Sequence, residues 1–323
     1  MEVNKYTAFS LGLMRRLYAR LFKLSDQKSD LKFDFQGQAA SDLIEEILAG
    51  PEPCMISRFG FYELDAILNY LDVIDDSNFL SKSIKYLKSE IGPFWWDDKI
   101  AFFMQNNAGF FPVNVANLQE FAKIMLNEIR NIDILGSWLA REARLADYLP
   151  NARIVKLSDL EPYYHSDPWS QVLEGKRVLV IHPFEESIKK QHAKYSVLFN
   201  DPRILPKFEL KTIKTVQSIA ANKTEFSNWF KALAFMCKRV SSMDFDMAII
   251  GAGAYGLPLA SFVKSLGKKA IHLGGATQLL FGIKGKRWDD YQFFRSLYNE
   301  NWVRPLPTEI PDNYQVVEGG CYW

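Results

Sequence analysis

Four short apolar runs in the C-terminal half constrain the fold more than any other feature of the chain. The clearest is Arg177–His182, whose Val-Leu-Val-Ile core is typical of a central strand in a parallel sheet. Glu209–Lys214, Asp246–Ile250 and Lys269–Leu273 have the same character, and the amphipathic stretch Glu225–Val240 lies between them. Strands that alternate with helices predict an α/β protein with a mostly parallel, Rossmann-like sheet and helices on both faces.

The N-terminal half shows the same alternation less regularly. Cys54–Phe59 and Lys99–Met104 have the composition of short strands. Helical periodicity is found in Ser41–Ala49, where Ser41 is the expected N-cap, and in Tyr62–Leu71 and Leu118–Arg130.

The chain of 323 residues is long enough for one large α/β domain or two closely packed parts. The aromatic and proline-rich stretch Pro162–Leu173 is the best candidate for a boundary. We expect an amphipathic helix and linker at 1–38, an N-terminal α/β portion at 39–165 and a C-terminal Rossmann-like portion at 166–323. One continuous domain is the alternative.

Composition excludes several classes of protein. Lys and Arg (39) balance Asp and Glu (38) to a net charge of +1, so binding of nucleic acid by bulk charge is not indicated. Cys54, Cys237 and Cys321 lie far apart and form no C-x-x-C, which argues against a disulfide framework and a cysteine zinc site. We therefore expect a reducing, cytoplasmic setting.

The N-terminus has no run of the roughly 20 apolar residues that cross a bilayer, and no signal-peptide cleavage pattern. Residues 6–24 combine an apolar series with basic residues: Phe9, Leu13, Leu17 and Leu21 with Arg15, Arg16, Arg20 and Lys23. This composition is typical of a basic amphipathic helix that lies on an anionic membrane, here the inner membrane face. The alternative is an ordinary helix that docks its apolar stripe on the domain.

A glycine-rich turn, Gly251-Ala-Gly253-Ala-Tyr255-Gly256, follows one of the expected strands and precedes an expected helix, Leu257–Leu266. Backbone N–H groups at such a helix N-terminus can bind a phosphate. A nicotinamide or flavin enzyme should also carry an acid about 20 residues on. The next strand ends at His272 without one, so the turn predicts phosphate binding but not NAD. Alternatively, the glycines only allow close packing of helix and strand.

Two earlier strand ends carry candidate catalytic side chains. Glu63 can face back over its strand end beside Arg58, where a carboxylate could hold a divalent cation that bridges phosphates. The alternative is an acid that complements the helix dipole and pairs with Arg58. At the other strand end, His182 is a candidate general base and Glu186 a second candidate, unless residues 185–190 form a solvated helical face.

The last strand end is followed by glycine pairs and a cluster of cations. Phosphate recognition favours Lys or Arg together with backbone N–H groups, and an aromatic side chain can stack on a base or a sugar. The alternative is a basic surface loop around a buried tryptophan. The candidate ligand-binding residues here are His272, Gln278, Lys284, Lys286, Arg287 and Trp288.

The segment Arg58-Phe-Gly60-Phe-Tyr-Glu63-Leu resembles the opening motif of the GT-D glycosyltransferases, R-[FY]-G-D-G-E-[LF]. In that family the motif follows the first strand, and its two carboxylates serve the metal and the nucleotide-sugar. Asp246–Gly275 is also similar to the C-terminal half of the family. The position of the motif's aspartate is Phe61 here, which leaves Glu63, and Asp65 would have to substitute from a different geometry.

The resemblance implies a hexosyltransferase-like enzyme that moves a sugar from a nucleotide-sugar to a glycan or lipid-linked acceptor in surface polysaccharide assembly. A divalent cation, Mg²⁺ or Mn²⁺, would be held by Glu63 and Asp65. The glycine turn and the cations after His272 would hold the diphosphate, and His182 or Glu186 would activate the acceptor of an inverting enzyme. The alternatives are a nucleotide-dependent oxidoreductase or sugar-modifying enzyme, and a degenerate nucleotide-sugar-binding protein, which Phe61 permits.

Overall fold

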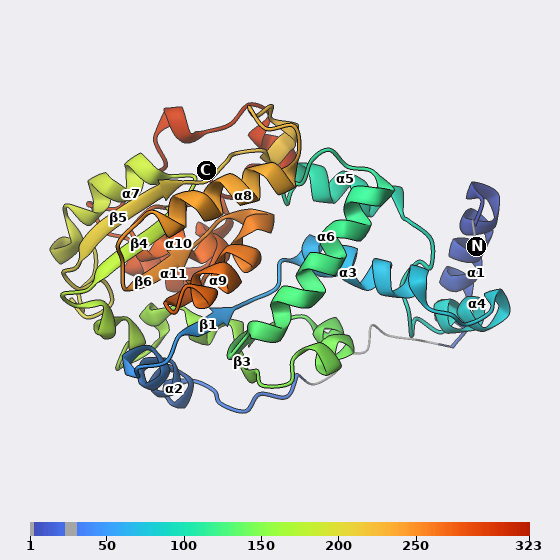
Figure 1. Cartoon of the computed structure of the whole chain (residues 1–323), viewed down its shortest axis with the longest axis horizontal. Coiled ribbons are helices and arrows are strands. Elements are labelled where there is room, and N and C mark those ends of the chain that lie inside the picture. Colours follow the sequence, from blue (N-terminus) through green and yellow to red (C-terminus); the bar gives the residue numbers. More distant parts are fainter. Residues whose placement is uncertain (1–2, 23–30) are drawn as a thin grey trace.

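The computed structural model describes residues 3–22 and 31–323. Its centre is a seven-stranded sheet with the order β3-β2-β1-β7-β6-β4-β5 (Figure 1). All pairings between neighbouring strands are parallel, which confirms the predicted α/β class with a parallel Rossmann-like sheet. The strands are β1 (Cys54–Ser57), β2 (Ile134–Ser137), β3 (Arg153–Lys156), β4 (Arg177–His182), β5 (Glu209–Lys214), β6 (Met247–Ile250) and β7 (Lys269–His272).

Successive side chains of each strand enter two different cores, because they point to opposite faces of the sheet. In β4, Leu179 and Ile181 join the core that contains α3 (Phe61–Ile74), α6 (Val115–Glu128), α8 (Trp229–Ser241) and α9 (Gly256–Ser265). Val178 and Val180 join the opposite core, with α2 (Gln38–Ala49), α7 (Glu185–His192), α10 (Thr277–Leu280) and α11 (Gln292–Leu297). Helices therefore cover both faces, as predicted.

The N- and C-terminal portions of the chain contribute to one sheet. β1 from the first portion pairs with β7 from the second, with Met55 opposite Ala270. The helices that follow these two neighbours lie on opposite faces, α3 in one core and α10 in the other. Such a switch opens a crevice above the carboxyl ends of the strands, where open α/β sheets bind their ligands.

Two expectations about single elements are wrong, and two strands were missed. Residues 99–104 are not a strand but part of α5 (Asp98–Asn106), capped by the side chain of Asp97, which accepts from the Lys99 N–H. The strands β2 and β3 were not expected. α2 begins at Gln38, three residues before Ser41, so Ser41 is not the N-cap of this helix. The Ser41 hydroxyl instead donates to the carbonyl of Asp167 and accepts from the N–H of Trp169.

Helices α1 (Lys5–Leu21) and α4 (Phe79–Leu87) pack together at one end of the molecule, away from the sheet (Figure 1). α1 docks through Leu11, which is buried against Tyr86 and Phe94. The apolar stripe from Phe9 to Leu21 is exposed, so the alternative in which this stripe packs on the domain is wrong. Residues 23 and 24 lie outside the described part of the chain.

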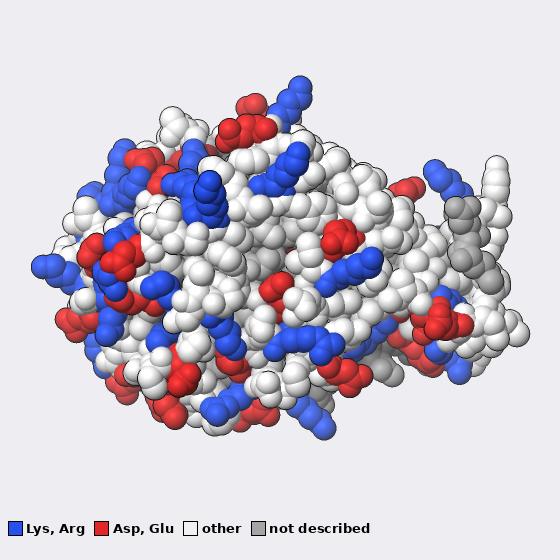
Figure 2. Space-filling view, viewed as in Figure 1, with Lys and Arg blue, Asp and Glu red and all other residues white. Residues whose placement is uncertain are grey.

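Charges of both signs are interspersed over the face of the molecule in Figure 2. Within the described residues, no helix is both long enough and apolar enough to pass through a bilayer.

Candidate functional site

A pocket of about 150 Å³ lies above the carboxyl ends of the strands. It is lined from six of the seven strand ends, all except the edge strand β3, and closed by the loop after α5 and the C-terminal residues. The strand ends contribute Arg58, Gly60–Glu63, Trp138, His182–Phe184, Thr215–Ile219, Gly251–Gly253, Tyr255, His272, Gly274, Gly275 and Gln278. The polar strand ends that the sequence singled out therefore share one cavity.

Arg58 is the central cation of the pocket. Its guanidinium lies 5.1 Å above the ring of Trp138, whose indole N–H donates to the carbonyl of Phe59 at 3.0 Å. The Trp138 loop is held by Glu142, which accepts from the backbone N–H groups of Trp138 and Leu139. Burial lowers the pKa of Arg58, and the charge of Glu63 raises it again. The Nε of Arg58 is buried without a hydrogen-bond partner in the described chain.

Glu63 is the buried carboxylate of the pocket, in the first turn of α3. A Cβ at Gly60 would overlap the Glu63 carboxyl group, so the glycine leaves the space into which this side chain folds back. Burial raises the pKa of Glu63, and its own backbone N–H and Arg58 oppose that shift. The arrangement holds a carboxyl group with an increased proton affinity beside a half-buried cation.

His182 at the end of β4 is a neutral hydrogen-bonding group. Its Nδ1 accepts from the Phe184 N–H at 3.0 Å. A backbone N–H can only donate, so the neutral ring carries its proton on Nε2. Burial lowers the pKa of His182 to about 3, which makes it a poor base at neutral pH. In this state it can donate from Nε2 to a ligand, and the role of general base stays a prediction.

His272 at the end of β7 is also neutral, because burial and the charge of Arg58 lower its pKa to about 3. Its Nδ1 lies 3.1 Å from the hydroxyl of Ser57 on the neighbouring strand. A Cβ at Gly256 would overlap the His272 ring. Gly256 is therefore required for close packing of α9 on β7, and it does not line the pocket.

Only some of the backbone N–H groups of the glycine turn are free to bind a phosphate. The N–H groups of Gly251, Ala254 and Tyr255 donate to carbonyl groups of the protein. Those of Ala252 and Gly253 have no acceptor in the described chain, and Gly253 has the left-handed φ of 51°. Two free N–H groups can contact one phosphate oxygen each.

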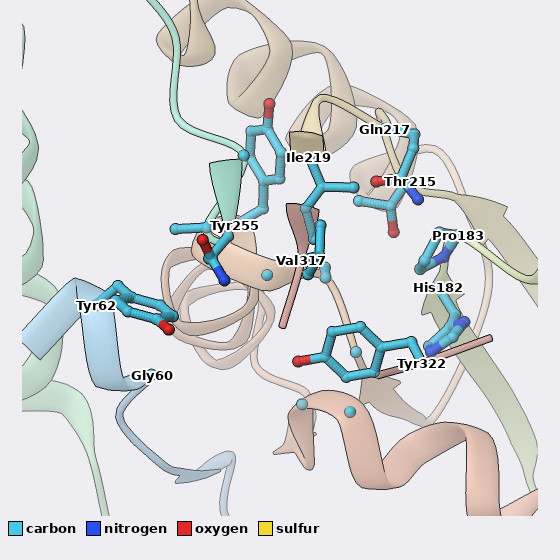
Figure 3. A pocket seen from close by; sticks show the side chains of 18 of the residues that line it. Gly60, Tyr62, His182, Pro183, Thr215, Gln217, Ile219, Tyr255, Val317 and Tyr322 are labelled. Atoms are coloured by element: carbon cyan, nitrogen blue, oxygen red, sulfur yellow. The ribbon is translucent and has the colours of Figure 1, made fainter. Parts of the chain in front are cut away.

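The C-terminal residues form one wall of the pocket. Glu318 accepts from the hydroxyl of Tyr62 at 3.1 Å and from Arg287 at 2.5 Å. The Arg287 guanidinium lies 4.7 Å above the ring of Tyr322. Figure 3 shows Tyr62 and Tyr322 on opposite sides of the pocket, with their hydroxyl groups directed toward its middle. The hydrogen bonds of Glu318 thus join this wall to the start of α3.

Several buried polar atoms around the pocket have no partner in the described chain. Besides Arg58 Nε, they are Asn107 Oδ1, Thr215 Oγ1 and Gln278 Oε1. Buried polar groups in proteins are nearly always hydrogen-bonded. Four such atoms around one cavity give it unused hydrogen-bonding capacity for a polar ligand or for ordered water.

The predicted site residues divide into two groups. Arg58, Glu63, His182, Gly251, Gly253, Tyr255, His272, Gln278 and Arg287 line the pocket. The others lie outside it. Glu186 is exposed and paired with Lys189, Lys284 lies over the ring of Tyr298, Lys286 donates to the carbonyl of Gly319, and Trp288 packs behind Tyr322.

Most residues that sequence reasoning missed come from loops distant in the chain. Asn107 to Gly109 follow α5, Trp138 follows an unrecognised strand, and Thr215 to Ile219 follow β5. Only the last group carried a usable signal, because it is a polar stretch directly after a well-defined strand.

The carboxylates of the motif do not converge on a metal site. Asp65 lies in a neighbouring cavity, where it pairs with Arg141, while Glu63 faces the pocket beside Arg58. Among residues 3–22 and 31–323, no group of three or more His, Cys, Asp or Glu side chains could hold a metal ion. The residues present therefore do not fit a divalent cation held by Glu63 and Asp65.

The buried His182 is expected to make the protein sensitive to acid. Its pKa is about 3 when folded and about 6.5 when unfolded, so the unfolded chain binds more protons between these values. The contribution of His182 to stability is complete above pH 6.5 and is lost as the pH falls toward 3. Between pH 7 and pH 5, the free energy of unfolding should fall by about 2 kcal/mol less in His182→Gln than in the native protein.

Urea unfolding at the two pH values measures this difference. His272 is present in both proteins, as are the acids that titrate in the same range, so their contributions cancel. Equal losses of stability in the two proteins would contradict a buried, neutral His182.

No protein-family model matches the chain, and no curated protein matches its sequence. Among solved structures, the chain is similar to one described as "Selenomethionine substituted structure of domain of unknown function 1792 (DUF1792)". The TM-score is 0.39 at 13% identity, and the match covers 93% of this chain and 96% of the other. At this distance the comparison says nothing about the chemistry of the pocket.

Proposed function

We propose that the protein is a glycosyltransferase that binds a nucleotide-sugar in this pocket and transfers the sugar to a hydroxyl group of a glycan or lipid-linked acceptor. The observation that carries the proposal is the half-buried Arg58, whose Nε–H is buried and has no partner in the described chain. A buried charge is costly unless an opposite charge lies close to it. The planar guanidinium fork suits a phosphate group, and binding a diphosphate would compensate that cost.

The walls of the pocket suit the rest of such a ligand. Trp138, Tyr62 and Tyr322 offer aromatic surfaces for a base or a sugar ring. The unpartnered oxygens of Asn107, Thr215 and Gln278 can accept or exchange hydrogen bonds with its hydroxyl and amide groups. The resemblance of Arg58–Glu63 to the GT-D motif points to the same class of ligand.

Transfer requires that the bond between the anomeric carbon and the phosphate oxygen breaks while a bond to the acceptor oxygen forms. We assign to Glu63 the acceptance of the proton from the acceptor hydroxyl, because its raised pKa brings it closer to that of an effective base at neutral pH. Arg58 stabilises the negative charge on the departing nucleoside diphosphate, and His182 donates from Nε2 to an oxygen of the ligand.

Thermal unfolding in the presence of UDP-, GDP- and CMP-sugars and of NAD(P) tests the proposal. We expect at least one nucleotide-sugar, and the nucleotide it releases, to stabilise the protein by about 2.7 kcal/mol at a concentration one hundred times Kd. Arg58→Gln should remove this stabilisation. The variant is compared without ligand as well, so that a loss of folding is recognised.

The other outcomes identify the remaining candidates. Stabilisation by NAD(P) alone would replace the transferase with an oxidoreductase. Stabilisation by a nucleotide-sugar without hydrolysis or transfer to any acceptor would indicate a binding protein, in keeping with Phe61 at the position of the motif's aspartate.

A further inference from the structure

The apolar side of α1 faces away from the protein. Its residues recur every three or four positions, so they share one side of the helix. The exposed fractions are 86% for Tyr6, 68% for Phe9, 46% for Leu13, 49% for Leu17 and 78% for Leu21. Soluble proteins rarely leave so many large apolar side chains together in water, which marks this side as a surface that becomes covered.

The docked side of α1 is a different one. Leu11 is buried against Tyr86, and the guanidinium of Arg15 lies 4.5 Å above the ring of Tyr86 and donates to the hydroxyl of Ser89. These contacts orient the helix and leave its apolar side outward. Leu80 and Ile84 of the adjacent α4 are exposed as well.

All charges of α1 are positive. The helix carries Lys5, Arg15, Arg16 and Arg20 and contains no Asp or Glu. Its one ion pair in the described structure joins Lys5 to Asp98 at 3.9 Å, between side chains that are more than 90% exposed, and such a pair contributes little. The apolar side is therefore accompanied by cations whose charge the protein does not neutralise.

The exposed apolar side of α1 and its cations favour a lipid surface over a second copy of the chain as the partner of this helix. Two copies that met through α1 would bring two helices of like charge together without a compensating acid. An anionic bilayer supplies both a hydrocarbon layer for the apolar side and opposite charge for the cations. We propose that α1 anchors the protein in the plane of an anionic membrane surface, with Phe9, Leu13 and Leu17 inserted below the headgroups.

The position of α1 allows this contact without disturbance of the pocket. The helix lies at the end of the molecule remote from the sheet (Figure 1). At 17 residues it is about 26 Å long, and no helix of the described residues is both long and apolar enough to cross a bilayer. It would lie on the surface of the membrane, and its binding does not depend on the proposed sugar transfer.

Flotation of the full chain with lipid vesicles tests this anchor. We expect binding to vesicles of phosphatidylcholine with 30% phosphatidylglycerol, weaker binding to phosphatidylcholine alone, and a decrease with salt (roughly physiological to 0.5 M). Leu13→Glu with Leu17→Glu should weaken binding more than about tenfold. Arg16→Glu with Arg20→Glu should weaken binding to the anionic vesicles and remove the dependence on salt.

A matched control places two glutamates on exposed apolar positions elsewhere, Val197→Glu with Phe235→Glu, and should bind as the native protein does. Thermal unfolding checks that every variant is folded. Three outcomes would overturn the proposal: no binding of the native chain to anionic vesicles, undiminished binding of the Leu13 and Leu17 variant, or a native dimer that this variant converts to a monomer in sedimentation. The last would replace the membrane with a second copy.

Discussion

Glu63→Gln is expected to reduce sugar transfer by about 10²–10⁴-fold while the protein remains folded. The amide cannot take a proton from the acceptor hydroxyl, and Glu63 is the carboxylate that reaches the pocket from α3. Gln keeps the size and shape of the side chain, but it leaves the Arg58 charge without the charge of Glu63 beside it. Thermal stability at neutral pH without ligand should therefore be unchanged or slightly lower in the variant.

Asp65→Asn is the matched control, since it removes a carboxylate from the same helix two residues on. Asp65 pairs with Arg141 outside the pocket, and the partly exposed pair should contribute at most about 1 kcal/mol. Transfer is measured by release of the nucleoside diphosphate in the presence of acceptor. Equal activity of the Glu63 variant and the native protein would exclude the role assigned to Glu63, and a large loss in Asp65→Asn would indicate a different site.

Gly251→Ala is expected to have the largest effect on stability, with a loss of about 3 kcal/mol in the free energy of unfolding. A Cβ at this position would lie 2.6 Å from the carbonyl oxygen of Gly274, 2.6 Å from Cδ2 of His182 and 2.8 Å from Oγ1 of Thr277. The carbonyl belongs to the backbone and cannot rotate away. The carboxyl ends of β4, β6 and β7 would have to separate, so affinity for the ligand should also fall.

Gly12→Ala serves as the comparison for this substitution. It lies inside α1, and the nearest atom to an added Cβ is the hydroxyl oxygen of Tyr86 at 3.9 Å. Alanine favours a helix over glycine, so stability should rise by about 0.5–1 kcal/mol. Urea unfolding measures both variants. If Gly251→Ala proved as stable as the native protein, the strand ends could not be packed as closely as described.

Five of the seven strands were predictable from sequence, and β2 and β3 were not. β4 and β5 have the predicted bounds. In β4, Arg177 and His182 enclose the apolar run Val-Leu-Val-Ile, whereas β5 (Glu-Leu-Lys-Thr-Ile-Lys) alternates apolar and polar residues as an edge strand does. β2 (Ile-Leu-Gly-Ser) and β3 (Arg-Ile-Val-Lys) each contain only two apolar residues in succession, which is too short a run to indicate a strand. The sequence of α5 also fits a strand, because a short apolar run is compatible with both periods. Asp97 at its start is the cap signal that favours the helix.

The site was predictable to the extent that it follows from the sheet. Parallel strands place their carboxyl ends at one edge, so Arg58, His182 and His272 could be grouped before their positions were known. Basic residues in sequence were a poorer guide, because Lys284 and Lys286 contact the protein surface outside the pocket. Glu318 and Tyr322 line the pocket because the C-terminal segment packs against residues distant in the chain, and no local sequence pattern predicts such packing.

The pairing of β1 with β7 also determines when the pocket can form during synthesis. Met55 in β1 pairs with Ala270 in β7, which is synthesised about 215 residues later. At roughly 5–20 residues per second, this delay is roughly 10–40 s. Until then β1 has an open edge, which is a site for incorrect pairing. The wall that contains Glu318 and Tyr322 is made later still. A ligand that needs this pocket therefore cannot stabilise the first strands while the chain is being made.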